Sequence, residues 1–563
     1  MSSRRFGLVV AVVGVSLVLA GCKGGDDGDG GAGAGAGAEQ GGTVHVLLAE
    51  DFSHLDPAQG WDSGVSNLYR LLYRTLTATG PGGTDTADDI VPDLATDLGT
   101  PSDGGKTWTF TLKDDVAFED GTPITSADIK FGVERSLDPR IAIGSPYAKT
   151  TLELPEDYAG YYESGPLDSI ETPDEKTIVF HLDHPEPEFA SVVSQAPFTP
   201  FPHEQADTIT RSSVDTAPVA SGPYRVESYD RGSSLVLTRN EHWSDASDDI
   251  RTAQPDEFDF TIGLDPATID ERLLAGQGDD ANAIGDQIQP ATLGRLNAPD
   301  IKSRVVSGMT GCTGFVQLDT SKDGMDDVRV RQAINYAVDR TSMQTAAGGP
   351  QMAETTTTIL PPSLPGYQEF DLYPGPDVAK AKELLAEAGY ADGFEFTLDV
   401  AAAPSSSAQA EAFQESLKKA GITVHLNSID AATYYEVVGA PAKQDDAVLA
   451  SWCPDWLSGS TFIPPLFEGS QIFDQGNSNR SMLDDPEINS EIQRIKSMTD
   501  VDAALAAWGD LDRLVMEKAP IVPTLNGNSV HVAGANVAQA FSNPSLNGNI
   551  DYAVVGLHDP DRG

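Results

Sequence analysis

Apolar and polar positions alternate along the chain with two periods, one typical of strands and one typical of helices. Residues 107–113, TWTFTLK, alternate strictly, which places Trp108 and Phe110 on one face of a half-buried strand and threonines on the other. We expect these two aromatic side chains to be core residues. An apolar, β-branched run over residues 44–48 predicts another strand, and residues 65–76 carry apolar side chains at helical spacing.

Capping residues mark the ends of further predicted helices. Thr125 followed by Asp128 resembles a capping box and predicts a helix that runs to Arg135. Asp377 and Gly389 bracket a second helix as its N-cap and C-cap. These signals place helices between the predicted strands.

The second half of the chain repeats strand and helix in turn. Residues 326–340 are amphipathic, residues 394–400 alternate as a strand, and residues 406–429 contain a helix that stops at Gly421 before another strand. Strand, helix and strand with short connections predict a parallel pair and a right-handed crossover. We therefore expect a mixed α/β protein, without a solenoid repeat and without a membrane span after the first 22 residues.

Length and charge narrow the class of protein. The chain has 563 residues, too many for one ordinary hydrophobic core, so two or three domains are expected. Its formal net charge is −50. Phosphate binding needs a basic face, so this charge argues against nucleic acid as a partner and against broad contact with an anionic membrane surface. Solubility and a salt-rich habitat both explain the charge, and the sequence does not separate them.

The first 22 residues have the pattern of an export signal. Arg4 and Arg5 precede an apolar run over residues 8–20 that is too short for a typical membrane span, and Cys22 follows. The ending LAGC resembles the bacterial lipobox. This implies that Cys22 receives a diacylglyceryl group and anchors the mature chain at the outer face of the cytoplasmic membrane. A plain signal peptide with an incidental cysteine is the alternative.

Two further cysteines, Cys312 and Cys453, would then lie in an oxidising compartment that permits a disulfide. They allow one intramolecular pairing, and two unrelated buried thiols are the alternative. Cys453 belongs to the segment SWCPDWL, in which Asp455 lies between Trp452 and Trp456. Trp and Cys prefer burial and Asp does not, so this combination indicates an unusual environment.

Catalytic and metal-binding motifs are missing from the sequence. It contains no HExxH, no Walker loop and no GxSxG. Residues 319–330 begin like an EF-hand loop, but Val330 occupies the position that needs a bidentate glutamate. His181 and His184 alone are weak evidence for a metal site. We therefore expect neither an enzyme nor a bound cofactor or metal.

Several segments resemble the family 5 extracellular solute-binding proteins, which are the dipeptide-, oligopeptide- and nickel-binding components of ABC importers. Residues 97–139 resemble the signature region of the family, and GGTVHVLLAEDFSHLDPA resembles its N-terminal strand and LDP turn. Residues 221–243 resemble the hinge-side GPY segment, and residues 326–340 are similar to a second hallmark. In this order, behind a lipobox, the segments make the resemblance specific over most of the chain.

The resemblance implies an α/β fold of the two-lobed periplasmic-binding-protein-like kind (type II, cluster C). A ligand cleft separates the lobes, an extra domain is inserted in lobe one, and hinge closure surrounds the ligand. Carried over, the expected segments are the signal peptide (1–21), a flexible Gly/Asp/Ala-rich tether (22–42), lobe one (43–85, 216–308 and 528–563), the inserted domain (86–215) and lobe two (309–527).

The resemblance also implies a ligand site in SWCPDWL. In oligopeptide binders of this family a WCADY-like segment supplies an aspartate that pairs with the α-ammonium of the peptide, and Asp455 matches that position. Those relatives bridge the adjacent cysteine to one in a strand before the second hallmark, which implies a Cys312–Cys453 disulfide here. A carboxylate in a closing, water-poor cleft gains strongly from an ammonium partner. Pro454 and Trp456 depart from the family pattern, which leaves the side-chain pockets and the substrate class open.

Further ligand contacts are expected from aromatic and main-chain groups. The faces of Trp452 and Trp456 can pack peptide side chains without demanding a sequence. Tyr147 matches a tyrosine of the inserted domain that can touch peptide in the family. Phe52 and Ser53, before the LDP turn, can offer main-chain hydrogen bonds to an extended peptide. Ordinary core packing is the alternative for the two tryptophans and for Tyr147.

These features predict a monomeric, lipid-anchored solute-binding protein that captures oligopeptides and delivers them to an ABC permease. Within the same class, an oligosaccharide or a metal chelate is an alternative ligand, because Trp-rich clefts suit sugars as well. A surface receptor that reports peptides to a signalling partner and an extracellular hydrolase are the alternatives from other classes. Peptide uptake after deletion of the protein, and peptide turnover by the purified protein, discriminate among these.

Overall fold

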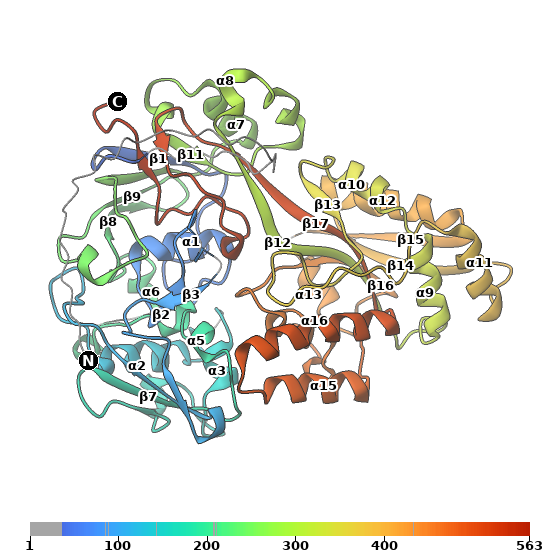
Figure 1. The fold of residues 1–563 in the computed structure, drawn as a ribbon, viewed down its shortest axis with the longest axis horizontal. Coiled ribbons are helices and arrows are strands. Elements are labelled where there is room, and N and C mark those ends of the chain that lie inside the picture. Colours follow the sequence, from blue (N-terminus) through green and yellow to red (C-terminus); the bar gives the residue numbers. More distant parts are fainter. Residues whose placement is uncertain are drawn as a thin grey trace, which may run out of the picture. The chain divides into compact units, whose positions relative to one another are not determined.

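The structure is a computed structural model, and it describes residues 37–562 apart from residues 85, 88, 142, 143, 207, 208, 210 and 432. The predicted signal peptide, Cys22 and most of the predicted tether lie outside the described residues. The described part of the chain is a mixed α/β protein, as the sequence predicts (Figure 1). Its larger sheets have five, six and four strands.

The five-stranded sheet forms lobe one and joins strands from distant parts of the chain. Its strands are β1 (Thr43–Leu47), β8 (Tyr224–Asp230), β9 (Ser234–Arg239), β10 (Glu257–Thr261) and β11 (Ala283–Gly285), and the helices of the lobe are α1 (Ser63–Leu72), α7 (Pro266–Ala275) and α8 (Pro299–Lys302). The strand order is β11-β1-β10-β9-β8, with β1 parallel to both of its neighbours. Val44 and Val46 face one apolar cluster and Leu47 faces another, as expected for a strand covered on both faces.

The four-stranded sheet belongs to the inserted domain. Its elements are β4 (Thr100–Ser102), β5 (Thr107–Thr111), β6 (Ile170–Glu171), β7 (Thr177–His181), α2 (Ser126–Ser136), α3 (Tyr147–Thr151), α4 (Tyr161–Ser164), α5 (Phe189–Val192) and α6 (Arg211–Val214), and the hairpin of β2 (Thr77–Thr79) and β3 (Ile90–Pro92) precedes it. Trp108 and Phe110 are buried in its core, which confirms their predicted role. The N–H of Thr125 donates to Asp128 at 2.7 Å, so the predicted cap starts α2.

The six-stranded sheet forms lobe two. Its strands are β12 (Val305–Leu318), β13 (Ala353–Thr355), β14 (Phe394–Ala401), β15 (Ile422–Ile429), β16 (Ala447–Trp452) and β17 (Ile521–Val532), in the order β13-β17-β12-β16-β14-β15. The helices are α9 (Val328–Ala337), α10 (Arg340–Ala346), α11 (Val378–Glu387), α12 (Pro404–Lys418), α13 (Tyr434–Val438), α14 (Ile463–Phe467), α15 (Pro486–Lys496) and α16 (Val501–Lys518). β14, α12 and β15 form the predicted unit with a parallel strand pair, and Asp377 caps α11 as expected.

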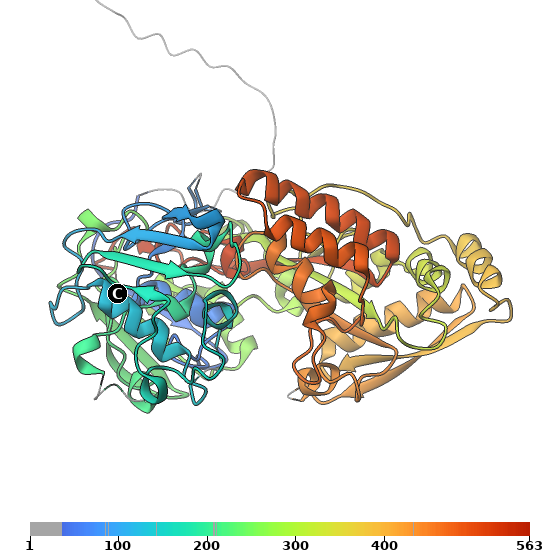
Figure 2. The same ribbon diagram turned by 90° about the horizontal axis from the view of Figure 1, so that it is seen from below.

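Two paired strands run from lobe one into lobe two. β12 and β17 are antiparallel, and Figures 1 and 2 show them running between the lobes. At one end Val532 packs with Leu47 in lobe one, and at the other end Val522 packs in the core of lobe two. Their register shifts between Met309 and Thr313. A two-stranded connection with an irregularity is a suitable hinge.

The C-terminal residues return to lobe one, where β18 (Val537–Ala538) pairs with β19 (Gly556–Leu557). Val555 and Leu557 join the core that contains β1, and Asp551 forms an ion pair with Arg70 of α1 at 3.0 Å. β12 and β17 each extend across a boundary expected between lobe one and lobe two. The boundaries themselves stay a prediction.

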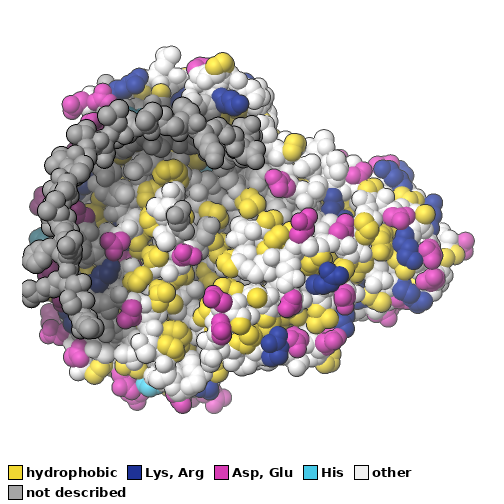
Figure 3. Space-filling view, in the orientation of Figure 1, with side chains coloured by type: hydrophobic (Ala, Val, Ile, Leu, Met, Phe, Trp, Pro, Cys, Tyr) yellow, Lys and Arg dark blue, Asp and Glu magenta, His cyan; other side chains and the backbone are white. Residues whose placement is uncertain are grey.

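The visible surface of lobe two carries both signs of charge. Figure 3 shows acidic side chains interspersed with Lys and Arg side chains over this lobe. Within the described residues, no helix has the length and apolar character needed to cross a membrane.

Candidate functional site

The SWCPDWL segment is fixed to the crossing strand β12 in two ways. β16 pairs with β12, with Trp452 opposite Thr313. Cys453 then forms a disulfide with Cys312, the pairing that the resemblance implies. Asp455 follows two residues later, so its position depends on the strand that runs between the lobes.

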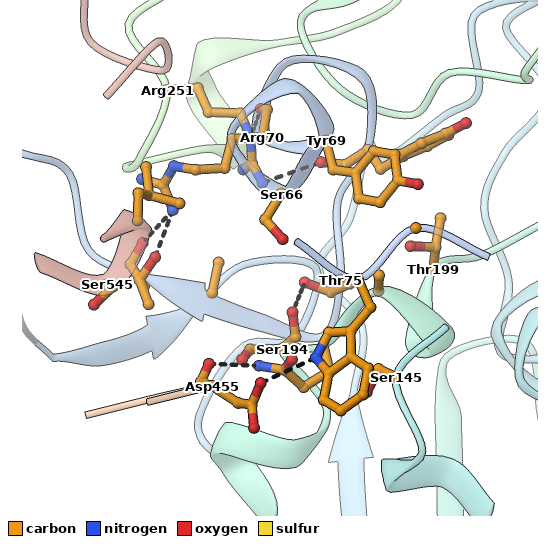
Figure 4. A pocket seen from close by; sticks show the side chains of 18 residues that line it. Ser66, Tyr69, Arg70, Thr75, Ser145, Ser194, Thr199, Arg251, Asp455 and Ser545 are labelled. Atoms are coloured by element: carbon orange, nitrogen blue, oxygen red, sulfur yellow. Dashed lines mark hydrogen bonds between the residues drawn. The ribbon is translucent and has the colours of Figure 1, made fainter. Parts of the chain in front are cut away.

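Asp455 reaches across from lobe two to lobe one and the inserted domain. Its carboxylate accepts hydrogen bonds from the indole N–H of Trp61 at 3.0 Å and from the hydroxyl of Tyr147 at 2.5 Å. Its carbonyl oxygen accepts a hydrogen bond from the side-chain amide of Gln195 at 3.2 Å (Figure 4). All three donors are neutral groups. Within the described residues the carboxylate therefore has hydrogen bonds but no ion pair.

Burial makes the charge of Asp455 costly. It raises the pKa of this carboxyl to about 6, although the hydrogen bonds from Tyr147 and Trp61 lower it. Burial and the charge of Asp455 in turn raise the pKa of the Tyr147 hydroxyl well above its ordinary value, so Tyr147 remains a neutral donor. At pH 7 Asp455 is mainly ionised, and a cation beside it would lower the free energy of the site.

A second carboxylate joins the inserted domain to the same segment. Glu188 accepts hydrogen bonds from the indole of Trp456 at 2.6 Å and from the hydroxyls of Ser458 at 2.9 Å and Ser460 at 2.7 Å. Trp456 is 6% exposed and packs in the core of the inserted domain, with its ring centroid 4.7 Å from that of Tyr147. Glu188 therefore links lobe two to the inserted domain through neutral donors.

Two pockets meet at Trp61 and Asp455. The first, which we call the hydroxyl pocket, lies against lobe one (Figure 4). Its hydroxyl-bearing side chains include Ser66, Thr75, Ser145, Ser194 and Thr199. Arg70 and Arg251 also line it, but both are already in ion pairs with buried aspartates. This pocket therefore offers neutral hydrogen-bonding groups around Asp455.

The second, which we call the acidic pocket, lies between the inserted domain and lobe two and has a volume of about 580 Å³. Its carboxylates belong to Asp183, Glu186, Glu188, Asp455 and Glu468. Aromatic side chains form other parts of its wall, including Trp61, Tyr147, Trp452, Trp456, Phe473 and Trp508. A concave site with aromatic walls and a few polar groups is the usual form of a small-molecule site.

The structure brings four of the predicted ligand residues together. Asp455, Tyr147, Trp452 and Trp456 all line the acidic pocket. Trp452 is half-buried, and its indole N–H donates to the carbonyl of Thr461 at 2.6 Å, which fixes its ring. The grouping agrees with a ligand site, and the ligand contacts themselves stay a prediction.

Phe52 and Ser53 lie elsewhere in lobe one. Phe52 is buried against Phe260, and its N–H donates to the carboxylate of Asp51. The Ser53 hydroxyl donates to Asp62 at 2.6 Å, and its carbonyl accepts from Arg231 at 3.1 Å. Several of their polar groups are thus used within the chain, and their main-chain contact with a ligand stays a prediction.

The sequence did not reveal the partners of the SWCPDWL segment. Trp61, Gln195 and Glu188 lie 260 or more residues from the groups that they contact. Trp61 is 44% exposed in the structure, and the sequence shows only a tryptophan shortly after the LDP turn. Nothing in the local sequence distinguishes Gln195 or Glu188 from surface residues.

No metal site is evident in the described part of the chain, where no group of three or more His, Cys, Asp or Glu is placed to hold an ion. His181 contacts Glu171 at 2.7 Å, and His184 contacts the adjacent Asp183. These two histidines are therefore engaged with carboxylates as separate pairs.

A family model matches residues 89–474, namely that of the bacterial extracellular solute-binding proteins, family 5 Middle. The glutathione-binding protein GsiB of Salmonella paratyphi A is 23% identical over 521 residues, covering 91% of this chain and 94% of that protein. The probable D,D-dipeptide-binding periplasmic protein DdpA of Escherichia coli K12 is 26% identical over 510 residues, covering 88% and 91%.

A similar solved structure is that of the clavulanic acid biosynthesis oligopeptide binding protein 2. Its TM-score is 0.88 at 34% sequence identity, and the match covers 94% of this chain and 98% of that chain. The two-lobed architecture is therefore shared over nearly the whole chain.

Proposed function

Because the chain belongs to the bacterial extracellular solute-binding proteins of family 5, we propose that it captures peptides outside the cell and delivers them to the permease of an ABC importer. The family consists of binding proteins and not of enzymes. The proposal includes a lipid anchor at Cys22, action as a monomer, and a position at the outer face of the cytoplasmic membrane. DdpA and the clavulanic acid biosynthesis oligopeptide binding protein 2, both named as peptide binders, support the ligand class.

One observation carries the assignment of the ligand's N-terminus. Asp455 is a largely ionised carboxylate at the junction of two pockets, and its described partners are all neutral. An α-ammonium group supplies the missing positive charge and three N–H donors. A charge-assisted hydrogen bond of this kind is about twice as strong as a neutral one.

Capture proceeds by closure of the lobes. Asp455 belongs to lobe two, whereas Trp61 belongs to lobe one and Tyr147 to the inserted domain. A ligand held by these three residues has contacts on both sides of the cleft. It therefore binds the closed form more tightly than the open form, which is the requirement for capture by closure.

The neighbouring aromatic residues support the proposal that the site accepts peptides of different sequence. Trp452 and Tyr147 supply faces to the acidic pocket, and Trp456 holds Tyr147 in place from the core of the inserted domain. Aromatic faces attract aliphatic, aromatic and cationic side chains alike. Main-chain hydrogen bonds along Phe52 and Ser53 complete the proposed set of contacts.

The test compares Asp455→Asn with the unaltered protein by calorimetric titration of short peptides. We expect the substitution to weaken peptides with a free N-terminus by more than tenfold, because one charge-assisted bond is lost. N-acetylated peptides should bind both proteins equally weakly. Asp392→Asn, which removes an exposed carboxylate of lobe two, is the matched control and should change nothing. Equal affinity of the unaltered protein for free and N-acetylated peptides would refute the role of Asp455.

Two further measurements test the ligand class and the delivery step. Mass spectrometry of compounds released from the denatured mature protein should find a mixed set of short peptides, and a single sugar or chelate would overturn the peptide assignment. Deletion of the protein should abolish peptide uptake. Uptake that persists would instead indicate a receptor that reports peptides without transporting them.

A further inference from the structure

The acidic pocket holds more negative charge than the described residues balance. Glu468 is paired with Lys496 at 2.9 Å. Glu186, Glu188 and Asp455 have no ion pair with a Lys or Arg among the described residues, and their hydrogen-bond donors are neutral groups. Carboxylates shielded from water are costly without a counter-charge. The pocket therefore lacks the positive charge that would balance these carboxylates.

Glu186 is the least satisfied of these carboxylates. It accepts one hydrogen bond, from the N–H of Glu188 at 3.0 Å, and its second oxygen lies 3.9 Å from Nε2 of His184. Burial and then the charge of Glu188 raise the pKa of Glu186 to about 7, whereas the hydrogen bond from the N–H of Glu188 and the charge of Lys496 lower it. Its carboxylate thus has room for a strong donor.

The remaining wall of the pocket suits a long side chain with a polar end. Trp452, Trp456 and Tyr147 offer aromatic surface that packs against aliphatic stems and attracts cations. Trp508 also lines the pocket, is 1% exposed, and has an indole N–H without a hydrogen-bond partner among the described groups. An acceptor on the ligand would satisfy this buried donor.

Glu186 and Asp455, the proposed ammonium site, both influence the Tyr147 hydroxyl. The charges of Asp455, Glu186 and Glu188 all raise the pKa of the Tyr147 hydroxyl, which lies 2.5 Å from Asp455. Both Glu186 and Asp455 line the same cavity. One small ligand with two positive charges can therefore meet both carboxylates.

We propose that the acidic pocket receives a cationic side chain of the ligand, whose guanidinium or ammonium group pairs with Glu186. The preferred ligands are then peptides with an Arg or Lys residue close to a free N-terminus. This inference rests on the proposed function, because the same peptide places its α-ammonium on Asp455. A metal ion is the poorer occupant, since the described residues provide no group of three ligands for one.

The test uses peptides that differ only in charge. Arginine and citrulline have nearly the same shape, but citrulline is neutral, so Arg-Ala-Ala and Ala-Arg-Ala are compared with their citrulline counterparts by calorimetry. Of the two arginine peptides, one will bind the unaltered protein more tightly. We expect that peptide to bind about tenfold or more tightly than its citrulline counterpart. In Glu186→Gln the two affinities should agree within about twofold, while binding of the citrulline peptide is nearly unchanged.

Two control variants separate this inference from the proposed function. Glu411→Gln removes an exposed carboxylate on α12 and should keep the full preference for arginine. Asp455→Asn should weaken arginine and citrulline peptides in parallel. Thermal unfolding checks that Glu186→Gln is folded. If this variant does not fold, the affinities of the unaltered protein for the arginine peptide and for the citrulline peptide test the cationic pocket by themselves.

The outcomes are distinct. Equal binding of arginine and citrulline peptides, together with a tenfold loss on N-acetylation, overturns the cationic pocket and leaves peptide capture standing. Failure of every free N-terminal peptide to bind overturns both. A preference for arginine that persists in Glu186→Gln assigns the cation to another group and overturns the role of Glu186.

Discussion

Two groups of charged residues in this protein, one buried and one around the acidic pocket, are built in opposite ways. At the contact between lobe one and the inserted domain, arginines and aspartates form a group of direct ion pairs in which every side chain is 8% exposed or less. Its members are Arg70, Arg74, Arg251, Asp93, Asp248 and Asp551. Each guanidinium also donates to backbone carbonyls or hydroxyls. Other residues of the same chain therefore balance the charges of this group.

The acidic pocket lacks such internal balance. Glu186, Glu188 and Asp455 rely on neutral donors, and burial raises the pKa of both Glu186 and Asp455. Carboxylates therefore have two uses in this protein. Paired charge stabilises the contact between lobe one and the inserted domain, whereas we propose that a ligand neutralises the carboxylates of the acidic pocket.

Loss of the ion pairs around Arg251 should lower the stability of the fold strongly. Arg251→Met removes the partner of Asp93 at 2.9 Å and of Asp248 at 3.0 Å, and leaves buried carboxylates without their full compensation. We expect a loss of about 3–5 kcal/mol in the free energy of unfolding, measured by chemical denaturation.

Arg225→Met is the matched control for this prediction. Arg225 is 42% exposed and pairs with Glu227 on the surface, so its removal should cost about 1 kcal/mol or less. If both variants lose the same stability, the distinction between a structural network and ordinary surface pairs is wrong.

A second, smaller effect is expected at the link between the inserted domain and lobe two. Glu188→Gln keeps the size of the side chain but loses its charge and part of its capacity to accept from Trp456, Ser458 and Ser460. Affinity for all peptides should fall roughly tenfold, because one hydrogen bond to a charged group contributes about 1.5–3 kcal/mol. Calorimetry measures the loss, and small-angle scattering should show a more open average form.

This variant should differ in kind from Glu186→Gln. Glu188→Gln is expected to weaken arginine and citrulline peptides more evenly, whereas Glu186→Gln acts on the arginine peptide. Identical profiles for the two variants would mean that both carboxylates act as one site.

The pH dependence of peptide binding tests the role of Asp455 separately from that of Glu186. The pKa of Asp455 is about 6 before a cation binds, and the proposed ammonium contact requires the ionised form. Below pH 6, affinity for a peptide with a neutral side chain should therefore fall by up to about tenfold per pH unit. The measurement is made in Glu186→Gln, because Glu186 titrates in the same pocket. Adding Asp455→Asn should make the profile flat, and a profile that stays sloped would place the titrating group elsewhere.

The smallest expected effect is on stability. Between its ordinary pKa of 3.8 and the folded value of about 6, Asp455 binds more protons in the folded chain than in the unfolded chain. Its contribution therefore destabilises the fold progressively as pH rises through this window, and is constant above it. Asp455→Asn should match the unaltered protein in stability near pH 4 and exceed it by on the order of 1 kcal/mol at pH 7. Equal stability at both pH values would show that burial at Asp455 costs nothing.

Local patterns were sufficient to predict much of the framework. The strict alternation around Trp108 and Phe110, the cap at Asp377 and the parallel unit of β14, α12 and β15 all depend on neighbours in sequence, and the structure contains them. The two-lobed fold and the disulfide followed from the resemblance, because single motifs do not encode how distant segments meet.

The surroundings of Asp455 lay beyond sequence reasoning for a physical reason. Trp61 lies 394 residues before Asp455, and Tyr147 lies 308 residues before it, so no periodicity links them. Trp456 agrees with both alternatives expected for it. It packs in the core of the inserted domain, as ordinary packing predicts, and it also lines the acidic pocket, as a ligand contact predicts. Charge balance in a pocket is likewise a property of the folded arrangement.

The core that β1 and α1 share with Val555 and Leu557 also sets the order of folding. Arg70 and Asp551 are 481 residues apart in sequence, yet their ion pair and the packing of Leu557 near β1 belong to one core. A chain leaving the ribosome cannot complete lobe one until Asp551 and Leu557 have been made. Lobe one therefore reaches its final form only after the inserted domain and lobe two have been synthesised.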